Sequence, residues 1–283
     1  MLATPSLTAL SVTDLNVADP IAQAVGQVQT KALDALVSPV DIEVQGLTKH
    51  FGATRIFSDV SFRLARGEAV ALVGANGTGK STLLRSLMGL IPVTQGHVRV
   101  LGQDMAAANA AGVRAVRTRI GLVSQKHNLV PRLSVLSNVV QGLLGQYPGP
   151  RHWCHSFAPE PSRRAAMSAL EKVGLADFAL RRADRRSGGQ SQRVAIARAI
   201  VGQPQILFAD EPCASLDPAA GEDVMALFFD LVRQQGVTVV FTSHNIAHAL
   251  DYGDRVLGLA DGRVKLDATA ASLSADDLRG LYD

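Results

Sequence analysis

The sequence has few cysteines, no long apolar run and no strong excess of either charge. Its two cysteines, Cys154 and Cys213, form no CxxC pair, which excludes a disulfide scaffold and favours a reducing compartment. No apolar run approaches the roughly 18 residues that a membrane-spanning helix needs. No basic start followed by a short apolar core marks a secretory signal. We therefore expect a chain that does not span a membrane itself, with the cytoplasm as its simplest location.

Charge and length narrow the class of protein only a little. The formal net charge of +3 is mild. Nucleic-acid binding would need a clustered basic face, so we expect no nucleic-acid partner. The 283 residues, with 47% hydrophobic content, suit one large globular domain or a domain with an appendage.

The first 40 residues differ in composition from the rest. They carry almost no charge and no glycine-rich punctuation. Apolar residues recur there at helical spacing: Ile21, Val25, Val28, Ala32 and Leu36. Two interpretations of residues 1–40 remain open, a loosely ordered leader or a short amphipathic helix that docks on a partner.

From Asp41 to Asp283 the pattern is that of an α/β domain. The stretch "FSDVSFRLARGEAVALVG" alternates apolar and polar residues, whereas "QILFAD" and "VTVVFTS" are continuous apolar runs followed by helical patterns. Strands buried on both faces with helices between them predict a parallel sheet. A more helical stretch, about residues 131–202, predicts a subdomain inserted into the sheet domain.

The first chemical motif is "GANGTGKST", which follows an apolar strand pattern and precedes a helical one. Its glycines let backbone N–H groups wrap phosphates, and the helix N-terminus adds a partial positive charge. We expect Lys80 to reach the β- and γ-phosphates and Ser81 to ligate Mg²⁺. The residues expected to contact a nucleotide here are Gly74, Asn76, Gly77, Gly79, Lys80, Ser81 and Thr82.

The second motif, "ILFADEP", ends an apolar strand pattern in two carboxylates. Asp210 is placed to hold Mg²⁺, directly or through water. Glu211 is placed to act as general base on the attacking water. In isolation such a pair more often caps a helix, and the phosphate loop upstream favours the catalytic interpretation.

The third motif, "RRSGGQ", predicts a second phosphate-binding helix start. Ser187 is a natural helix cap, and Gly188 and Gly189 permit close approach of a phosphate to the backbone. One triphosphate cannot lie against both loops of a compact monomer if the loops are far apart. We therefore expect Ser187 and Gly189 to bind the γ-phosphate of an ATP held by another subunit, in a two-fold homodimer with two composite sites.

With these motifs in this order, the chain from Asp41 to Asp283 resembles the ATP-binding subunits of ABC transporters. The phosphate loop matches Walker A, and residues 206–211 match Walker B with its catalytic glutamate. The other matches are Gln125 to the Q-loop glutamine, Ser187–Gln190 to the signature, Asp217 to the D-loop, His244 to the switch histidine and Phe51 to the aromatic residue that stacks on adenine.

The resemblance implies a fold and a set of roles. The implied fold is the P-loop NTPase core of the ABC ATPase type, with an inserted helical subdomain and an antiparallel β subdomain. ATP and Mg²⁺ are the implied ligands. The implied catalytic residues are Glu211, His244, Gln125 and Lys80; further nucleotide contacts are Phe51, Ser187, Gly189, Gln190 and Asp217; and the Mg²⁺ ligands are Ser81, Gln125 and Asp210.

Some positions depart from the family pattern or allow a simpler interpretation. Arg186 stands where leucine usually precedes the signature serine, which predicts altered packing at the subunit interface. Phe51 replaces the commoner tyrosine and would pass for a core residue without the glycine after it. Asp217 could equally cap the helix that starts at Pro218. The basic cluster Arg181, Arg182, Arg185 and Arg186 is a solvated face, or it contacts anionic lipid or a membrane subunit.

Two stretches resemble the phosphonate importers within this family. They are "NLVPRLSVLSNVVQGLLG" and the insert "PRHWCHSF", whereas Asn245 stands where glutamine is expected in phosphonate members. The resemblance implies import of phosphonate or a related phosphorus oxyanion. Import of another solute and an exporter remain alternatives. A metal site in the insert, from His152, Cys154 and His155, is a rival interpretation without an evident fourth ligand.

The resemblance also implies partners and a location. A homodimer of these subunits would bind membrane permease subunits at the cytoplasmic face of the inner membrane as a peripheral protein, and a periplasmic or extracellular solute-binding protein would act indirectly. A DNA-acting ABC protein would need a long coiled coil, and a ribosome-acting one usually has two cassettes; neither feature is present. A binding-only module would be expected to lose Lys80 or Glu211.

Overall fold

The computed structural model describes residues 39–282. The two interpretations of residues 1–40 therefore fall almost wholly outside the described residues, including the proposed helix around residues 21–36. Within the described residues, none of the helices combines the length and apolar content needed to cross a membrane.

An antiparallel sheet forms the first layer, in the strand order β2-β1-β4-β5. It consists of β1 (Val40–Phe51), β2 (Thr54–Ala65), β4 (Gln95–Val100) and β5 (Gln103–Asp104). On β2, Val60, Phe62 and Leu64 are buried while the residues between them are exposed, which is the alternation expected when one face of a sheet packs on a core. This is the antiparallel β subdomain that the resemblance implied.

The second sheet has the order β10-β9-β3-β8-β7-β6. Its parallel strands are β3 (Ala69–Val73), β6 (Ile120–Ser124), β7 (Ile206–Asp210), β8 (Thr238–Thr242) and β9 (Arg255–Ala260), and β10 (Arg263–Thr269) adds an antiparallel edge. Every residue of β3 and β8 is buried. The predicted parallel α/β sheet is therefore confirmed, and its continuous apolar runs are explained by burial on both faces.

Successive residues of the central strands enter two different cores. Ile206 and Phe208 pack in the cluster that includes the antiparallel sheet, whereas Leu207 and Ala209 pack in the cluster that includes the helices beyond. Because both faces are filled, a register slip of one residue would exchange the two sets of side chains. The strand ends that carry the site are therefore held at fixed levels.

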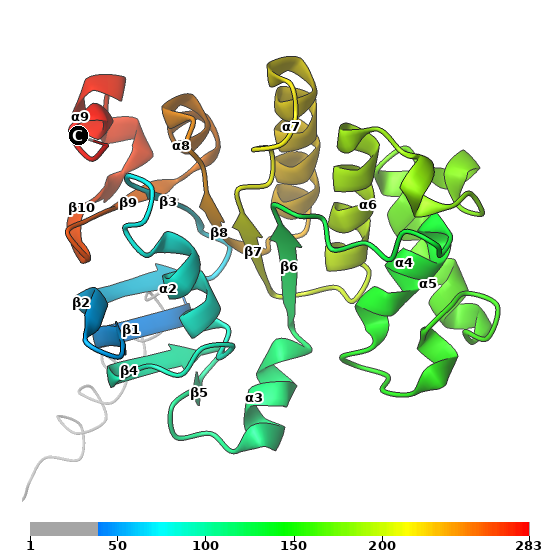
Figure 1. Ribbon diagram of the computed structural model, residues 1–283, viewed down its shortest axis with the longest axis horizontal. Helices are drawn as coiled ribbons and strands as arrows, with labels where there is room; N and C mark the ends of the chain where they lie inside the picture. The colour runs from blue at the N-terminus through cyan, green and yellow to red at the C-terminus, as the bar shows by residue number, and fades with distance from the viewer. Residues whose placement is uncertain (1–38, 283) are drawn as a thin grey trace, which may run out of the picture. The chain divides into compact units, whose positions relative to one another are not determined.

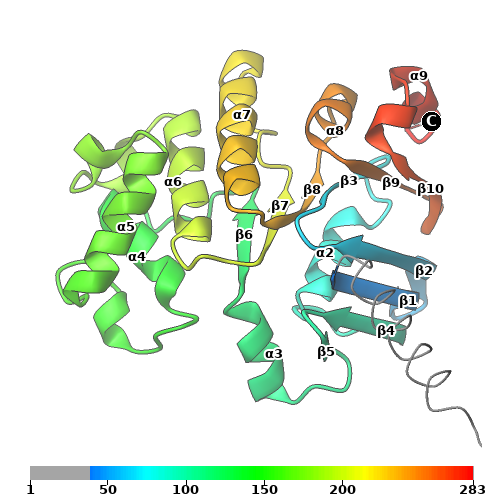
Figure 2. The ribbon, with the colours of Figure 1, turned by 180° about the vertical axis from the view of Figure 1, so that it is seen from behind.

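The helices surround this sheet (Figures 1 and 2). They are α2 (Lys80–Leu87), α3 (Ala110–Arg117), α4 (Val135–Val140), α5 (Glu160–Lys172), α6 (Gly188–Ile200), α7 (Pro218–Gln234), α8 (Ile246–Tyr252) and α9 (Ala275–Arg279). Helices α4, α5 and α6 contact one another and lie together on the far side of β6 from α2. We call these three helices and their connections the helical part; the bounds 131–202 remain a prediction.

A glycine allows the closest approach inside the helical part. Gly142 lies in the 3₁₀ turn η1 (Gln141–Leu143), which continues α4 and faces α6. A Cβ atom there would lie 2.2 Å from the carbonyl oxygen of Arg198 and 2.6 Å from Val201 Cγ1. Only glycine fits at this distance, because the carbonyl belongs to the α6 backbone and cannot swing away.

We expect Gly142→Ala to lower the free energy of unfolding by about 1–3 kcal/mol, because the methyl group must push α6 away. Urea unfolding measures the change. Gly145→Ala is the matched control, since a Cβ at Gly145 would meet nothing closer than Thr118 Cγ2 at 3.6 Å. Equal stability of the two variants would contradict this account of the packing.

Candidate functional site

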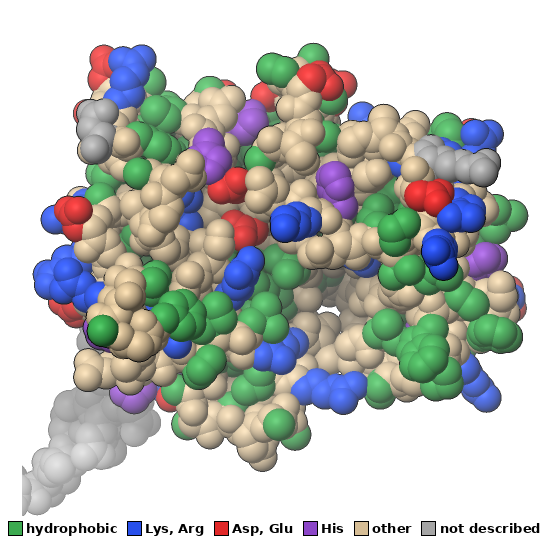
Figure 3. Space-filling model, in the orientation of Figure 1, with side chains coloured by type: hydrophobic (Ala, Val, Ile, Leu, Met, Phe, Trp, Pro, Cys, Tyr) green, Lys and Arg blue, Asp and Glu red, His purple; other side chains and the backbone are tan. Residues whose placement is uncertain are grey.

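The carboxyl ends of β3, β7 and β8 meet at one edge of the parallel sheet, where ligands of open α/β sheets usually bind. Gly74 follows β3, Asp210 ends β7 and Thr242 ends β8. On the face shown in Figure 3, acidic and histidine side chains lie near one another over this region, with Lys or Arg side chains beside them. The predicted phosphate loop and the predicted carboxylates are thus brought together.

The phosphate loop adopts a backbone that requires glycine. Gly74, Gly77 and Gly79 have φ angles of 141°, 82° and 100°. A Cβ at Gly74 would lie 2.1 Å from the carbonyl oxygen of Leu259, on the neighbouring strand. Helix α2 begins at Lys80 and has no side-chain cap at Gly79. Its first N–H groups therefore remain available for an anion.

Lys80 folds back over its own loop. Its Nζ donates to the carbonyl oxygens of Gly74 at 2.7 Å and Ala75 at 2.9 Å. Burial lowers the pKa of the Lys80 ammonium, and the nearby carboxylates of Glu211 and Asp210 act in the opposite direction. The side chain is thus held across the mouth of the loop, where a phosphate would meet it.

One oxygen of Asp210 joins the loop to the neighbouring strand. Asp210 Oδ1 accepts from Ser81 Oγ at 3.0 Å and from Thr242 Oγ1 at 3.0 Å. Thr242 Oγ1 in turn accepts from the backbone N–H of Glu211 at 2.8 Å. Thr242 was not among the predicted site residues. A polar residue at the end of the apolar run "VTVVFTS" was the signal that could have identified it.

Glu211 is held in an unusual backbone conformation. Its φ angle is 50°, in the left-handed region that non-glycine residues rarely adopt. Strain of this kind costs on the order of 1–3 kcal/mol and persists where surrounding contacts enforce it, commonly at active sites. The hydrogen bond from its N–H to Thr242 is such a contact. With the backbone held in this conformation, the Glu211 side chain reaches His244.

His244 and Glu211 form a direct pair. His244 Nε2 lies 2.6 Å from Glu211 Oε1, and because a carboxylate only accepts, the imidazole is the donor. The two side chains are 38% and 18% exposed, so both reach solvent. The predicted base and the predicted switch histidine are therefore in direct contact. A cavity of about 150 Å³ lies beside them.

Residues beyond the motifs hold the switch segment in place. Ser243 Oγ accepts from the Asn245 N–H at 3.0 Å and lies 3.3 Å from His248 Nδ1. His248 Nε2 is 3.2 Å from Glu222 on α7, and Tyr252 also donates to that carboxylate. The turn that carries His244 is thus tied through α8 to α7, a network with no signal in the sequence.

The last described residues contact both halves of the site. Tyr282 donates from its hydroxyl to the Ser243 carbonyl oxygen at 3.3 Å. The carbonyl oxygen of Leu281 accepts from the N–H of Ala75 in the phosphate loop at 3.2 Å. The turn after α9 therefore links the phosphate loop to the segment that presents His244.

Gln125 follows β6 directly and is exposed. Ser124 pairs with Asp210 in the parallel register of β6 and β7, so Gln125 and Glu211 leave the sheet at the same level. Phe51 is 50% exposed at the end of β1, with Lys49 Nζ 4.5 Å from its ring centroid. The ring is therefore not a core residue and offers a surface on which a base could stack.

The signature residues lie away from the phosphate loop. Ser187 caps α6 by accepting from the Gln190 N–H at 3.3 Å, while the Gln190 side chain accepts from the Ser187 N–H at 3.4 Å. Figure 1 shows α6 and α2 on opposite sides of β6 and β7. Between residues 39 and 282, no hydrogen bond joins Ser187–Gln190 to Gly74–Thr82. The two predicted helix starts are therefore separated within one chain, and phosphate binding at the second stays a prediction.

Asp217 and Arg186 have clear structural contacts. Asp217 caps α7 by accepting from the Ala220 N–H at 3.0 Å, in agreement with the simpler of its two interpretations. The Arg186 guanidinium lies 4.8 Å from the ring centroid of Phe178. The Arg186 side chain is thus placed by a cation–π contact within the chain, and the altered packing at a subunit interface stays a prediction.

The insert is organised by serines. His152 Nε2 lies 2.9 Å from Ser162 Oγ, and His155 Nδ1 lies 2.8 Å from Ser137 Oγ. In the part of the chain that the structure describes, no group of three or more His, Cys, Asp or Glu side chains is arranged to hold a metal. Burial raises the pKa of the Cys213 thiol to about 12, which disfavours its thiolate form.

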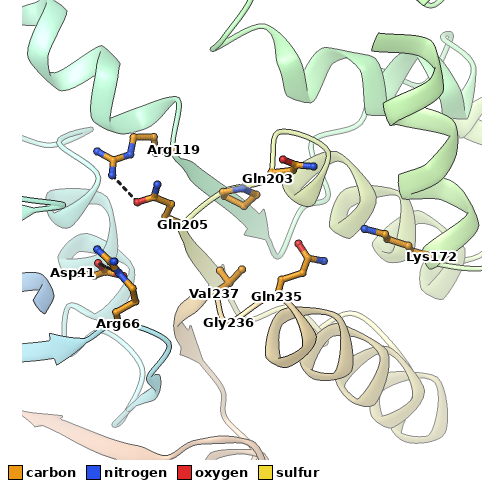
Figure 4. Close-up of a pocket in the computed structure, with 10 residues that line it drawn as sticks. Asp41, Arg66, Arg119, Lys172, Gln203, Gln205, Gln235, Gly236 and Val237 are labelled. Carbon is orange, nitrogen blue, oxygen red and sulfur yellow. Dashed lines mark hydrogen bonds and ion pairs between the residues drawn. The ribbon is translucent and has the colours of Figure 1, made fainter. Parts of the chain in front are cut away.

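A second cavity lies at the opposite edge of the sheet (Figure 4). It has a volume of about 680 Å³ and is polar. Two of its cationic side chains already have partners: Arg66 Nε is 3.2 Å from Asp41 Oδ1, and Arg119 donates to Gln205 at 2.6 Å. The cavity contains none of the predicted site residues, because they follow the carboxyl ends of the strands.

A family model and several named proteins are similar to this chain in sequence. A family model described as ABC transporter matches residues 57–214. The phosphonates import ATP-binding protein PhnC of Nocardia farcinica is 46% identical over 243 residues, which are 86% of this chain and 90% of that protein. The phosphate-import ATP-binding protein PhnC of Mycolicibacterium smegmatis is 46% identical over 243 residues, 86% of this chain and 92% of that protein.

Solved structures with the same fold include a cassette caught after hydrolysis. The ATP-binding cassette MJ0796, in a dimeric post-hydrolysis state bound to ADP and Pi, matches with a TM-score of 0.71 at 33% identity, over 81% of this chain and 98% of that chain. CbiO1 from Clostridium perfringens, part of the ABC transporter complex cbiONQ, matches with a TM-score of 0.74 at 27% identity, over 85% and 92%.

The hydroxyl of Thr242 provides a test of this site. In Thr242→Val the shape is kept, but Asp210 loses a donor and the Glu211 N–H loses its acceptor. We expect the rate of ATP hydrolysis to fall about ten- to a hundredfold, because Glu211 is no longer held in position. Steady-state ATPase assays measure this. Thr242→Ser keeps the hydroxyl and is the control; a Val variant as active as the Ser variant would contradict the role.

Proposed function

The chain belongs to the ABC transporter family, and from this premise we propose that it is the ATP-hydrolysing subunit of an importer for phosphonate or a related phosphorus oxyanion. One observation carries the hydrolytic part: the phosphate loop, Asp210 and the Glu211–His244 pair lie together at one sheet edge. The names of relatives at 46% identity, which concern phosphonate and phosphate import, support the cargo.

The residues of one chain divide the work of binding and hydrolysis. Phe51 stacks on the base, while the loop N–H groups and Lys80 hold the phosphates. Glu211 accepts the proton of the attacking water, and His244, at 2.6 Å from Glu211, fixes the orientation of that carboxylate. Gln125 leaves the sheet at the level of Glu211, so it can contact the same water.

Ser81 and Asp210 fit a magnesium site. Hydroxyl and carboxylate oxygens are ligands that Mg²⁺ accepts, and Ser81 Oγ and Asp210 Oδ1 lie 3.0 Å apart at the end of the phosphate loop. Gln125 is the third proposed ligand. When bound, the ion would help to neutralise the negative charge that develops on the phosphates during hydrolysis.

Each hydrolytic site is completed by a second copy of the chain. Ser187 and Gly189 are proposed to bind the γ-phosphate of an ATP held by the partner, with Gln190 and Asp217 beside them. The separation of α6 from α2 within one chain supports this arrangement (Figure 1). A similar cassette has been described as a dimer. A two-fold dimer would place one phosphate loop and one signature at each of two sites.

The transport role places the dimer against permease subunits. We propose a peripheral position at the cytoplasmic face of the inner membrane, with a periplasmic or extracellular solute-binding protein as an indirect partner. Closure of the dimer around ATP switches the permease, and hydrolysis reopens it. The cargo has no need to touch this chain. Another cargo, or an exporter, is the alternative that the growth experiment below distinguishes.

The shared site is tested by Ser187→Arg. The long cation fills the space of the partner's γ-phosphate, so we expect ATP hydrolysis to be lost while nucleotide binding to the monomer is unchanged. ATPase assays and titration with a fluorescent ATP analogue measure the two. Ser187→Thr keeps the helix cap and is the control. Substantial hydrolysis by the Arg variant would refute the composite site.

The cargo is tested by growth. In a strain without the gene, we expect the wild-type chain to restore growth on one of phosphonate, phosphite or phosphate as the sole phosphorus source. Glu211→Gln should restore none, because loss of a general base slows hydrolysis by about a hundredfold or more while ATP binding remains. If all strains grow equally on every source, the cargo assignment fails and only the ATPase assignment stands.

A further inference from the structure

The segment directly after Gln125 is strained. His127 and Asn128 have φ angles of 46° and 48°, two successive non-glycine residues in the left-handed region. Each such residue costs on the order of 1–3 kcal/mol and persists only where its surroundings enforce it. In Figure 1 this segment leaves β6 and crosses to the helical part. The strain therefore sits at the junction between the sheet and the helical part.

Arg198 enforces this conformation from α6. Its guanidinium donates to two successive carbonyl oxygens, that of His127 at 2.5 Å and that of Asn128 at 2.6 Å. A planar guanidinium reaches two acceptors through two separate nitrogens in a rigid fork, whereas a lysine ammonium offers its donors from a single nitrogen on a flexible stem. The two strained residues are the two that Arg198 grips. The contact therefore fixes the backbone of residues 127–128 and also gives the guanidinium two hydrogen-bond acceptors.

A second anchor holds the same segment from α4. Asn138 is fully buried. Its Oδ1 accepts from the Val130 N–H at 2.7 Å, and its Nδ2 donates to the Val130 carbonyl oxygen at 3.2 Å. Residues 127–130 are thus bound to α6 and to α4, both within the helical part.

The other end of the segment is bound to the sheet. The His127 N–H donates to the Ser124 carbonyl oxygen at 3.1 Å, and Asn128 Nδ2 donates to Ser124 Oγ at 2.8 Å. Gln125 lies in the short loop between these contacts and has no side-chain hydrogen bond of its own within the described residues. Its position is set by the residues on either side of it.

We infer that Arg198 is a positioning residue for Gln125: by holding the carbonyl oxygens of His127 and Asn128, it fixes the loop in which Gln125 lies. This deepens the proposed function, on which it rests. A simpler alternative is that Arg198 only complements the C-terminal dipole of α6 and adds stability. The two roles of Arg198 predict different kcat values when the backbone preference of residue 128 is changed and Arg198 is kept.

An exposed position allows that change. Asn128 is exposed, so its replacement disturbs no core. Asn128→Gly permits the left-handed conformation without strain, and Asn128→Val opposes it. We expect Asn128→Val to lower kcat about tenfold with the KM for ATP within about twofold, because a misplaced catalytic group slows the reaction without loosening nucleotide binding. Asn128→Gly retains more activity than the Val variant.

The same assay on Arg198→Lys tests the grip itself. The lysine ammonium keeps the positive charge and its contribution to stability. It lacks the rigid fork that places two donors on the carbonyl oxygens of His127 and Asn128. We expect kcat to fall about tenfold at nearly unchanged KM, and Arg198→Lys with Asn128→Gly to regain at least about threefold, a coupling that a double-mutant cycle measures. Arg164→Lys, in an exposed pair on α5, is the matched control.

The outcomes separate the two roles. A lowered kcat in Asn128→Val, together with rescue of Arg198→Lys by glycine, establishes the positioning role. Wild-type kcat in both Asn128→Val and Arg198→Lys overturns it, as does a loss of kcat in Arg198→Lys that tracks a lower unfolding temperature and is not rescued by glycine. If Arg198→Lys does not fold, the Asn128 pair decides alone. The cargo proposal fails separately, since growth reads cargo and these assays read hydrolysis.

Discussion

The hydrogen bonds to Asp210 Oδ1 are the interaction on which the site depends. One carboxylate oxygen holds a hydroxyl from α2 and a hydroxyl from β8. Asp210 and Thr242 are direct partners in the register of β7 and β8. That register is fixed by strands whose alternate side chains fill two separate cores. The phosphate loop, Glu211 and His244 are therefore placed by hydrophobic packing that lies outside the site.

This rigid base holds two unusual backbone conformations at the carboxyl edge. Gly74 approaches a neighbouring backbone too closely for any side chain, and Glu211 has a positive φ angle. Both follow buried strands that cannot shift to relieve them. The same logic holds for His127 and Asn128, which follow β6 and are gripped by Arg198. At these three residues, Glu211, His127 and Asn128, the left-handed backbone is enforced by contacts where the chain leaves β7 or β6.

Much of the site could be predicted because its chemistry is local. The phosphate loop needs glycines and a lysine within nine residues, and "ILFADEP" places two carboxylates at a strand end. The parallel sheet followed from apolar runs that only two-sided burial explains. His248 and Arg198 could not be assigned roles from the sequence, because their partners lie 26 and 70 residues away. Thr242 could have been noticed as a polar residue at the end of an apolar run, but its contact with Asp210 is evident only in the fold. Arg186 was expected at an interface, and its stacking on Phe178 depends on the fold of the helical part.

Helix α6 connects the two functions that the motifs suggested separately. Its first turn is capped by Ser187 and presents N–H groups, and Arg198 lies about 16 Å further along at the rise of an α-helix. Seven of its thirteen residues are buried, and the helix contacts both the helical part and the sheet side at β6 and α7. An anion bound at the first turn and the loop that carries Gln125 are therefore attached to the same body.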